Sequence, residues 1–279
     1  MPRVALATAA TWPDLDADSA LLVPALAALG VDAEPAVWDD PAVDWSTYDL
    51  VVVRSTWDYV PQREAFLAWA RRVPRLHNPA DVLAWNTDKT YLRDLVAAGV
   101  PVVPTTFVAP GEAYEPPPGV VVVKPTVSAG AQDTERHEDA RGAAPLVARL
   151  HAQGRTAMVQ PYLDGIDVAG ETAVLLFDGE PSHGARKDAL LVGPPVDLED
   201  DLAMMSAREP SRAELEVALA AVAAVPGQQR LLYARVDLVP GPDGTPVVME
   251  LELTEPSLFL RFAPGSARRC ARAVAARLG

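Results

Sequence analysis

Val247-Val248-Met249-Glu250-Leu251-Glu252-Leu253-Thr254-Glu255 alternates apolar and acidic residues with a period of two, which predicts a strand with two different faces. We expect Met249, Leu251 and Leu253 to point into a core. Glu250 and Glu252 then share the opposite face, roughly 7 Å apart along the strand. Two carboxylates at that spacing repel each other unless a cation lies between them. A hard divalent metal ion is the natural candidate, because it prefers oxygen ligands.

A second alternating stretch, residues 233–239, comes shortly before and places Arg235 and Asp237 on one face. The turn-forming sequence of residues 240–244, Pro-Gly-Pro-Asp-Gly, joins the two stretches into an expected hairpin. Asp237 then lies opposite or diagonal to Glu250, close enough for the two carboxylates to share an ion. The hairpin alone fits a solvent-facing strand pair with mixed charges about equally well.

The bulk composition limits the class of protein. The chain has 279 residues, of which 49% are hydrophobic and 22% charged, which is enough for a large core and for two or three packed units. The net charge of −14 argues against a nucleic-acid partner, because phosphates would be repelled. A nucleotide is still compatible with this charge, since lysines and a metal ion can meet its phosphates locally.

Cysteine content and the sequence of the N-terminus bear on the cell compartment. Cys270 is the only cysteine, so no disulfide framework and no cysteine metal cluster is expected, and its Arg-rich helix suggests a structural role. Neither a signal peptide nor a membrane span is recognisable. We therefore expect a soluble, cytoplasmic protein that does not bind membranes.

The first third of the chain alternates strand-like and helix-like segments. Strands are expected at residues 4–9, 31–38 and 50–53, and helices at residues 19–29 and 62–73. The valine-rich third strand shows no alternation, as is typical of a parallel sheet covered on both faces. This rhythm predicts an open, mostly parallel sheet, in which ligands bind at the carboxyl ends of the strands.

A polar and aromatic loop stands at one of these carboxyl ends. It contains Arg54, Ser55, Thr56, Trp57, Asp58 and Tyr59. We interpret it as a substrate site in which Arg54 meets a carboxylate. The alternative is a loop whose Trp and Tyr only pack on the following helix.

Two lysines stand at positions that suggest phosphate binding. Lys89 falls in the first turn of a helix expected to begin after Thr87 as N-cap, where the helix dipole does not favour a cation. Lys124 follows a run of valines, where an unpaired lysine is costly to bury. The next loop, residues 126–134, is small and hydroxyl-rich, and its backbone amides could surround an anion. The common Walker A and G-x-G-x-x-G loops are absent.

The order of these motifs resembles the ATP-grasp superfamily, which includes D-alanine–D-alanine ligase and glutathione synthetase. The order runs from Lys89 and Lys124 through residues 160–163, Glu171 and Lys187 to the acidic hairpin. The resemblance implies an α/β (α+β) ATP-grasp fold with an N-terminal parallel-sheet domain (residues 1–82), a central lid subdomain (83–163) and a C-terminal subdomain with the metal site (164–279). The last two would clamp ATP, and a homodimer is common among such proteins.

The resemblance also implies roles for individual residues. Lys89 and Lys124 would bind the α- and β-phosphates, under a loop formed by Ser128, Ala129 and Gly130. Gln160, Tyr162 and Leu163 would line the adenine pocket, and Glu171 would hold the ribose. Lys187, with Arg186, would face the γ-phosphate. Asp237, Glu250 and Glu252 would hold two Mg²⁺ ions, and Arg235 would stabilise the acyl-phosphate. Many family members carry Asn in place of Glu252, but a carboxylate remains a competent oxygen ligand.

Three segments, residues 54–59, 85–89 and 250–257, look most like the branch that contains the O-ureido-serine cyclo-ligase of D-cycloserine biosynthesis. The resemblance implies an ATP-dependent ligase that activates a carboxylate of an amino acid or small peptide as an acyl-phosphate for attack by an amine. Intramolecular ring closure is the alternative, while an ATP-grasp phosphotransferase and a regulatory ATP-binding module fit less well. Arg261 is a second candidate for a substrate carboxylate, or else a surface residue. Residues 194–209 are expected to form an acidic loop.

Overall fold

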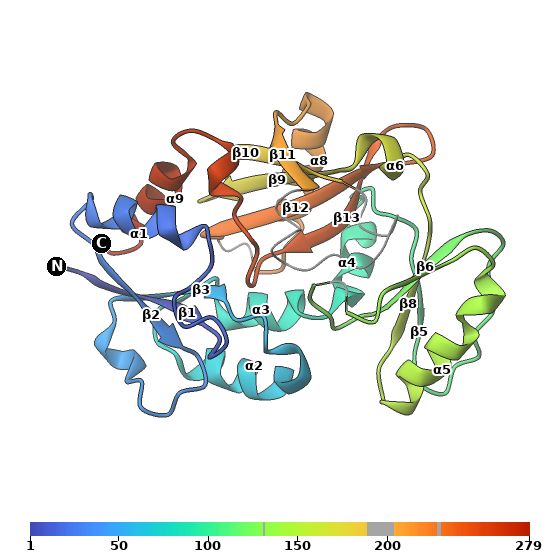
Figure 1. The fold of residues 1–279 in the computed structure, drawn as a ribbon, viewed down its shortest axis with the longest axis horizontal. Helices are drawn as coiled ribbons and strands as arrows, with labels where there is room; N and C mark the ends of the chain where they lie inside the picture. The colour runs from blue at the N-terminus through green and yellow to red at the C-terminus, as the bar shows by residue number, and fades with distance from the viewer. Residues whose placement is uncertain (131, 189–203, 228–229) are drawn as a thin grey trace.

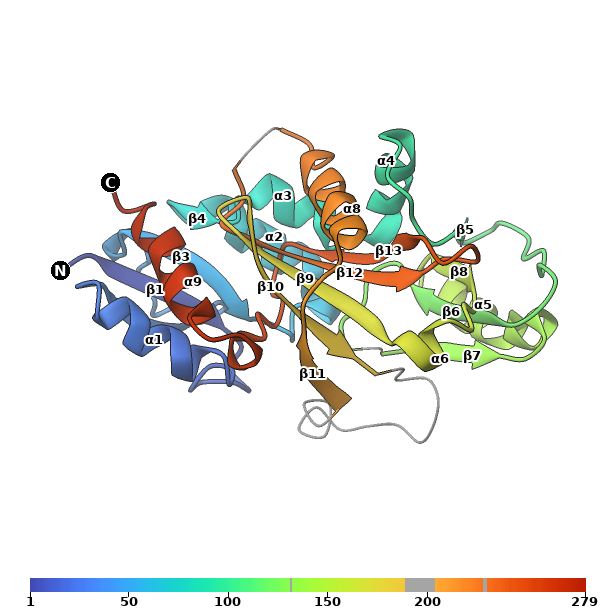
Figure 2. The ribbon, with the colours of Figure 1, turned by 90° about the horizontal axis from the view of Figure 1, so that it is seen from above.

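The computed structural model describes residues 1–130, 132–188, 204–227 and 230–279. Its strands form three sheets (Figure 1). The N-terminal sheet and the middle sheet lie at opposite ends of the molecule, and the C-terminal sheet spans the region between them (Figures 1 and 2). The predicted mixed α/β architecture, with a parallel sheet at the N-terminus, is confirmed.

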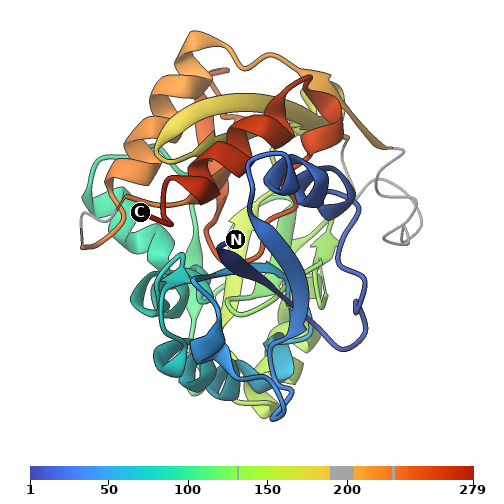
Figure 3. The same ribbon diagram turned by 90° about the vertical axis from the view of Figure 1, so that its left-hand side faces the viewer.

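The N-terminal sheet has the order β2-β1-β3-β4, with parallel pairing throughout. Its strands are β1 (Arg3–Thr8), β2 (Asp32–Val37), β3 (Leu50–Ser55) and β4 (Leu76–His77). Helices α1 (Ser19–Ala27) and α9 (Ser266–Ala275) lie side by side over one face (Figure 3), and α2 (Arg63–Arg72) covers the other. Both faces of β3 are therefore buried: Leu50 and Val52 pack toward α1 and α9, and Val51 and Val53 toward α2. This explains why the strand shows no alternation in sequence.

Cys270 lies on α9 within the same core. Burial raises the pKa of its thiol to about 12, so the thiolate is scarce at neutral pH. The structural role expected for this cysteine is consistent with its position.

The middle sheet is antiparallel, with the order β5-β8-β6-β7. Its strands are β5 (Thr106–Val108), β6 (Val121–Pro125), β7 (Glu135–His137) and β8 (Ala157–Pro161). Helix α5 (Ala144–Ala152) packs on one face through Leu146, Val147 and Leu150. The alternating burial of β6 turns Lys124 to the face opposite this core.

The C-terminal sheet has the order β11-β10-β9-β12-β13. Its strands are β9 (Glu171–Phe177), β10 (Glu180–Lys187), β11 (Met205–Arg208), β12 (Tyr233–Pro240) and β13 (Pro246–Glu252), with α6 (Ile166–Ala169) before β9 and α8 (Arg212–Ala223) packed on one face. Residues 194–203 of the expected acidic loop lie outside the described residues, while residues 205–208 form β11 rather than loop.

The predicted hairpin of β12 and β13 is confirmed, but its alternation is interrupted. The register shifts between Asp237 and Leu238, so that Met249 is an extra residue in β13. Such a β-bulge changes which residues share a face. Val248 therefore joins Leu251 and Leu253 in the core, whereas Met249 packs against a separate small cluster. The expectation that Met249 shares the core of Leu251 and Leu253 was wrong for this reason.

The outer edge of β13 is covered by side chains and by one short stretch of backbone. Asn86, at the end of helix α3 (Ala80–Asn86), donates to the carbonyl oxygen of Leu251 (2.7 Å) and accepts from the amide of Leu253 (2.7 Å). The Tyr91 hydroxyl accepts from the amide of Leu251 (2.8 Å). Residues 101–103 bond to Val248 in the manner of a parallel bridge.

The segment around Lys89 differs from the predicted single helix. Thr87 ends α3 instead of capping the next helix. Asp88 caps a short 3-10 turn (Lys89–Tyr91), and α4 (Leu92–Ala97) follows. Because an aspartate can accept from the amide two residues ahead, Asp88 competes successfully with Thr87 for the cap. The three sheets use residues 3–77, 106–161 and 171–252; the domain limits 82/83 and 163/164 stay a prediction.

Candidate active site

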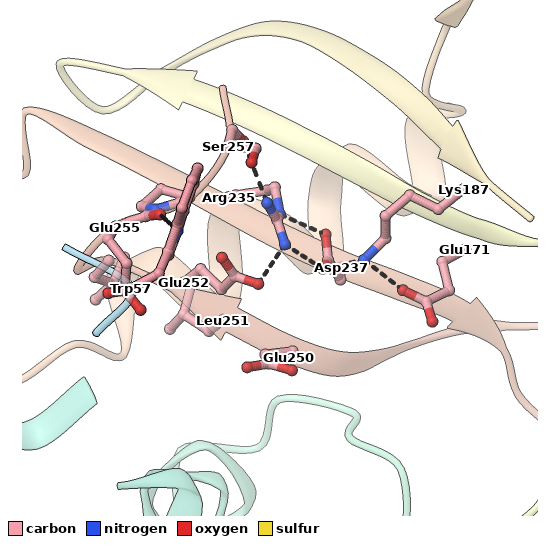
Figure 4. Close-up of polar contacts among 12 residues, drawn as sticks. Trp57, Glu171, Lys187, Arg235, Asp237, Glu250, Leu251, Glu252, Glu255 and Ser257 are labelled. Atoms are coloured by element: carbon pink, nitrogen blue, oxygen red, sulfur yellow. Dashed lines mark hydrogen bonds and ion pairs between the residues drawn. The ribbon is translucent and has the colours of Figure 1, made fainter. Parts of the chain in front are cut away.

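The hairpin brings four charged residues onto one face. Arg235 stands opposite Glu252, and Asp237 opposite Glu250 (Figure 4). The predicted proximity of Asp237 and Glu250 is confirmed by this register. Lys187 on β10 and Glu171 on β9 extend the same face (Figure 4).

These residues form a row of alternating charge. Lys187 Nζ lies 2.6 Å from both a Glu171 oxygen and an Asp237 oxygen. Arg235 Nε donates to Asp237 Oδ1 at 3.0 Å, and the same guanidinium contacts Glu252. The Asp237 side chain is only 2% exposed. Burial alone would raise the pKa of Asp237, but the positive charges of Arg235 and Lys187 hold it below its ordinary value. Asp237 is therefore ionised at neutral pH.

Two further lysines approach the row from other elements. Lys89 Nζ lies 3.1 Å from a Glu250 oxygen and donates to the backbone carbonyl of Ser128 at 2.8 Å. Lys124, at the end of β6, is near Glu250 as well, but burial and the neighbouring Lys89 lower its pKa. Three lysines thus converge from the 3-10 turn, the middle sheet and the C-terminal sheet. Phosphate groups would relieve their mutual repulsion.

The residues expected to bind adenine lie near the boundary of the middle and C-terminal sheets. Gln160 is buried in β8 and donates to the Thr105 hydroxyl at 2.9 Å. Tyr162 follows β8, its ring stacks beneath the Arg136 guanidinium at 4.2 Å, and its hydroxyl contacts Asp167. Leu163 packs beside it. Burial and Asp167 raise the pKa of Tyr162 to about 12, so its hydroxyl stays protonated.

The loop expected to cover the phosphates connects β6 to β7. Ser128 is buried against Lys89, and Gly130 adopts a positive φ of 59° that favours glycine. Ala129 lies between them, and residue 131 lies outside the described residues. The loop is held at its far end by Arg155, which pairs with Asp133 at 2.6 Å.

The donor set of the acidic face suits a magnesium ion by chemistry. Asp237, Glu250 and Glu252 offer carboxylate oxygens, which Mg²⁺ prefers. Among the residues that the structure describes, however, no three such side chains converge on a single point. Each of the three carboxylates contacts a lysine or arginine instead. Holding a metal ion therefore requires these cations to move toward another anion, as phosphates would allow.

Glu255 is a residue that the sequence interpretation missed. It follows β13 and lies beside Trp57, beyond Glu252 in the row (Figure 4). Burial and the nearby Glu252 raise the pKa of Glu255 to about 8, and burial raises that of Glu252 to about 7. Its position at an acidic strand end was visible in sequence, but the lack of an ion-pairing Lys, Arg or His among the described residues was not.

Burial of Glu255 predicts a pH-dependent stability. In the unfolded chain its carboxyl group titrates near 4.5, and in the fold near 8. The folded state therefore binds the proton more tightly, so stability should fall as pH rises from about 4.5 to about 8. Glu255→Gln should remove the part of this pH-dependent loss of stability that Glu255 causes. Urea unfolding of the wild type and the variant across that pH range would measure the difference. The exposed Glu180→Gln is the control, and a stability difference independent of pH would contradict the prediction.

The loop predicted to bind substrate is mostly engaged with the protein itself. Arg54 is fully buried; it pairs with Asp16 at 2.8 Å and donates to the carbonyl of Pro256 at 3.1 Å. Arg54 is thus an ion-pairing residue of the core rather than the ligand of a substrate carboxylate, because no part of its guanidinium is exposed. Ser55 is likewise buried, 2.7 Å from the Thr8 hydroxyl.

The rest of that loop turns partly toward the acidic face. Trp57 donates from its indole to the carbonyl oxygen of Glu255 at 3.1 Å. Tyr59 is buried and stacks on Phe66, and burial together with Glu255 raises its pKa well above the ordinary value. Asp58 accepts from the Trp38 indole at 2.9 Å. Only Trp57 and Tyr59 therefore adjoin the charged row.

Two predicted cations lie apart from the row. Arg186 donates to the carbonyl oxygens of Val168 and Ala169 and pairs with Asp188 at 2.6 Å. It therefore faces α6 rather than the group around Lys187. Arg261 is exposed in the 3-10 turn Leu260–Phe262.

Comparisons with known proteins identify the family. The family model "D-cycloserine synthetase DcsG, N-terminal domain" matches residues 4–78. The cycloserine biosynthesis protein DcsG of Streptomyces lavendulae is 40% identical over 297 residues, covering 100% of this chain and 99% of that protein. The crystal structure of D-cycloserine synthetase DcsG superposes with a TM-score of 0.91 at 38% identity, covering 99% of this chain and 100% of the other.

A more distant structure has the same fold. The ATP-grasp ligase PsnB, solved with a minimal precursor, Mg and ADP, has a TM-score of 0.64 at 20% identity, covering 99% of this chain and 97% of the other. The resemblance to the cycloserine branch is confirmed, and so is the ATP-grasp fold that it implies. This chain belongs to the family of the D-cycloserine synthetase DcsG, and its fold is that of the ATP-grasp proteins.

Proposed function

We propose that this protein is an ADP-forming ligase that uses ATP to activate the carboxylate of an amino acid and closes a ring within the same molecule. The observation that carries the proposal is the largely buried row from Glu171 to Glu252, which contains Lys187 and is approached by two further lysines, Lys89 and Lys124. The relation to a cycloserine biosynthesis protein favours ring closure, which was the alternative to an intermolecular ligase in the sequence interpretation.

The lysines are the groups that would receive the nucleotide. Lys89 and Lys124 would take the α- and β-phosphates, and Lys187 the γ-phosphate, since these lysines meet at the row from separate elements. The adenine would lie against Gln160, Tyr162 and Leu163. Glu171 would hold the ribose once Lys187 turns to phosphate. The loop of Ser128, Ala129 and Gly130 would close over the phosphates and exclude water.

Asp237, Glu250 and Glu252 would together bind two Mg²⁺ ions. Magnesium, when bound, offsets the charge of the transferring phosphoryl group. A structural relative solved with Mg and ADP supports the metal and the nucleotide. The arrangement of the carboxylates beside the lysines supports their exchange of partners: a lysine that leaves a carboxylate for phosphate frees an oxygen ligand.

The reaction proceeds in two bond exchanges. A carboxylate oxygen of the substrate bonds to the γ-phosphorus while the bond from that phosphorus to the bridging oxygen breaks, and ADP leaves. A nitrogen of the same substrate then bonds to the acyl carbon, the bond to the phosphate oxygen breaks, and the nitrogen gives its proton to the leaving phosphate. Arg235 would stabilise the negative charge on the acyl oxygen; its hydrogen bonds to Asp237, which fix the guanidinium within the row, support this role.

Glu255 would recognise the substrate's ammonium group, whose positive charge would lower the raised pKa of Glu255 and favour its ionised form. Every other carboxylate of the row contacts a cation, whereas none lies within ion-pair distance of Glu255 among the described residues. The residues outside the described part contain no Lys, Arg or His, so they add no cationic side chain. An α-ammonium lies close to its own carboxylate, and Glu255 is the neighbour of Glu252 at the end of the row (Figure 4). This geometry supports an amino acid with a free amino group.

The test is release of ADP and phosphate from ATP and Mg²⁺ in the presence of single D- and L-amino acids, pairs of amino acids, dipeptides and O-ureido-serine. Turnover with a single compound, giving a ring, supports the proposal. Turnover with pairs only would make the protein an intermolecular ligase. Binding of ATP without turnover on any compound would favour a regulatory module, and release of AMP would overturn the mechanism.

Two further expectations stay predictions. A reaction that consumes ATP fits the cytoplasm, and a homodimer can be tested by light scattering. Among the described residues, no helix is both long and apolar enough to cross a membrane.

A further inference from the structure

The segment that follows β13, residues 254–260, is held almost entirely by side chains from other parts of the chain. Its backbone carbonyl oxygens accept hydrogen bonds from Tyr233, Trp57, Arg54, Arg235, His183 and Ser266. This segment has no strand or helix of its own before the turn Leu260–Phe262. Its conformation therefore depends on these long-range contacts.

Asp18 binds the backbone amides of this segment. Its carboxylate accepts from three consecutive amides, those of Leu258 (2.7 Å), Phe259 (2.9 Å) and Leu260 (2.8 Å). The residue is 7% exposed and stands just before α1, 240 residues away from Leu258. Phe259 adopts a left-handed φ of 50°, which is unusual for a phenylalanine. Three amides converging on one anion compensate for this backbone conformation.

The same segment forms one side of the Arg235 environment. Arg235 donates to the carbonyl oxygen of Ser257 at 3.2 Å, and its guanidinium carbon lies 5.0 Å from the centre of the Phe259 ring. Asp237 and Glu252 hold the other nitrogens. The carboxylates thus set the orientation of the guanidinium plane on one side, and Ser257 sets it on the other (Figure 4). Phe259 lies on this second side as well, and its own amide donates to Asp18.

We propose that Asp18 is a positioning residue for Arg235, acting through Ser257 and Phe259. The proposal rests on the function proposed above, in which Arg235 stabilises the acyl oxygen. Asp18 belongs to the loop at the carboxyl end of β1. It therefore connects the N-terminal parallel sheet to the guanidinium of the C-terminal sheet. No atom of Asp18 needs to touch the substrate for this role.

The first test uses Asp18→Asn, which replaces one acceptor oxygen by an NH₂ group that faces amide donors. We expect kcat to fall about 10- to 100-fold, because small displacements of a catalytic group are costly, while KM for ATP stays within about twofold. In an Arg235→Lys background the same substitution should have little further effect on kcat, since residues acting through one group are not additive. Effects that multiply in the double variant would overturn the proposal. Asp44→Asn, which alters an aspartate that accepts from a backbone amide at an exposed turn of the N-terminal part, is the control.

The second test does not require turnover. The Arg235 Nε–H signal in ¹⁵N NMR spectra, assigned by its loss in Arg235→Lys, reports the hydrogen bond to Asp237. Asp18→Asn should shift or broaden this signal, and Asp44→Asn should leave it unchanged. An unchanged signal in folded Asp18→Asn would overturn the positioning role, whereas an inactive wild type would overturn only the proposed function. If Asp18→Asn fails to fold, Asp18→Ser, which keeps one oxygen acceptor, is measured in the same way with the same expectation.

Discussion

Asp237→Asn should lower kcat by about 10³-fold or more, the largest catalytic effect that we expect from one substitution. The carboxylate is nearly fully buried between Lys187 and Arg235. A neutral amide leaves both cations without their shared anion, and it replaces one of the three charged carboxylates proposed to bind magnesium by a neutral, weaker oxygen ligand. Release of ADP by the purified variant measures the loss, and calorimetric titration with ATP shows whether nucleotide still binds.

A matched control separates catalysis from stability. Asp178 also pairs with two arginines, Arg230 and Arg277, but lies outside the charged row. Asp178→Asn should therefore reduce stability and leave kcat close to that of the wild type. If Asp237→Asn kept full turnover, the assignment of the acidic hairpin as the reaction centre would be wrong.

Arg54→Met should destabilise the fold by about 3–5 kcal/mol, because it leaves Asp16 as a buried and unpaired carboxylate. It also removes the donor to the carbonyl oxygen of Pro256. Urea unfolding of the wild type and the variant would measure this change. Adding Asp16→Asn should recover part of the loss, since the double variant carries no unpaired charge.

This prediction distinguishes the two interpretations of Arg54. A ligand of the substrate carboxylate, as the sequence suggested, would raise KM for the substrate on substitution and leave stability nearly unchanged. The buried pair instead implies lost stability with KM altered little in the fraction that stays folded. A stable Arg54→Met variant with a strongly raised KM would restore the first interpretation.

A comparison of Arg235 with Arg54 shows why part of the site could be predicted from the sequence and part could not. Arg235 shares a period-two strand with Asp237, and alternation fixes which residues of one strand share a face. The turn signal between the two strands then fixes their approximate register, so the pairing with Glu250 and Glu252 followed. Arg54 also ends a recognisable strand, but its partner Asp16 comes from a loop 38 residues earlier. Local pattern carries no information about such a contact.

Glu255 and Met249 show two further limits. Glu255 was visible as an acidic residue after β13, yet a carboxylate is identified as unpaired only when all neighbouring cations are placed. Met249 was assigned to the core because strict alternation was assumed. A bulge adds one residue to a strand without a clear mark in the sequence, and it reverses the expected faces beyond that point.

The position of β13 as the last strand of its sheet has a consequence for solubility. A free strand edge exposes amides and carbonyls that can pair with a second molecule and start aggregation. Here the edge strand is β13, which carries Glu250 and Glu252. Its backbone must hold these two carboxylates in place and must also be unable to pair with a strand of another molecule. The carboxamide of Asn86, the Tyr91 hydroxyl and residues 101–103 occupy its hydrogen-bonding groups. A side-chain amide reproduces the pairing of a peptide group without adding a strand, and so it terminates the sheet.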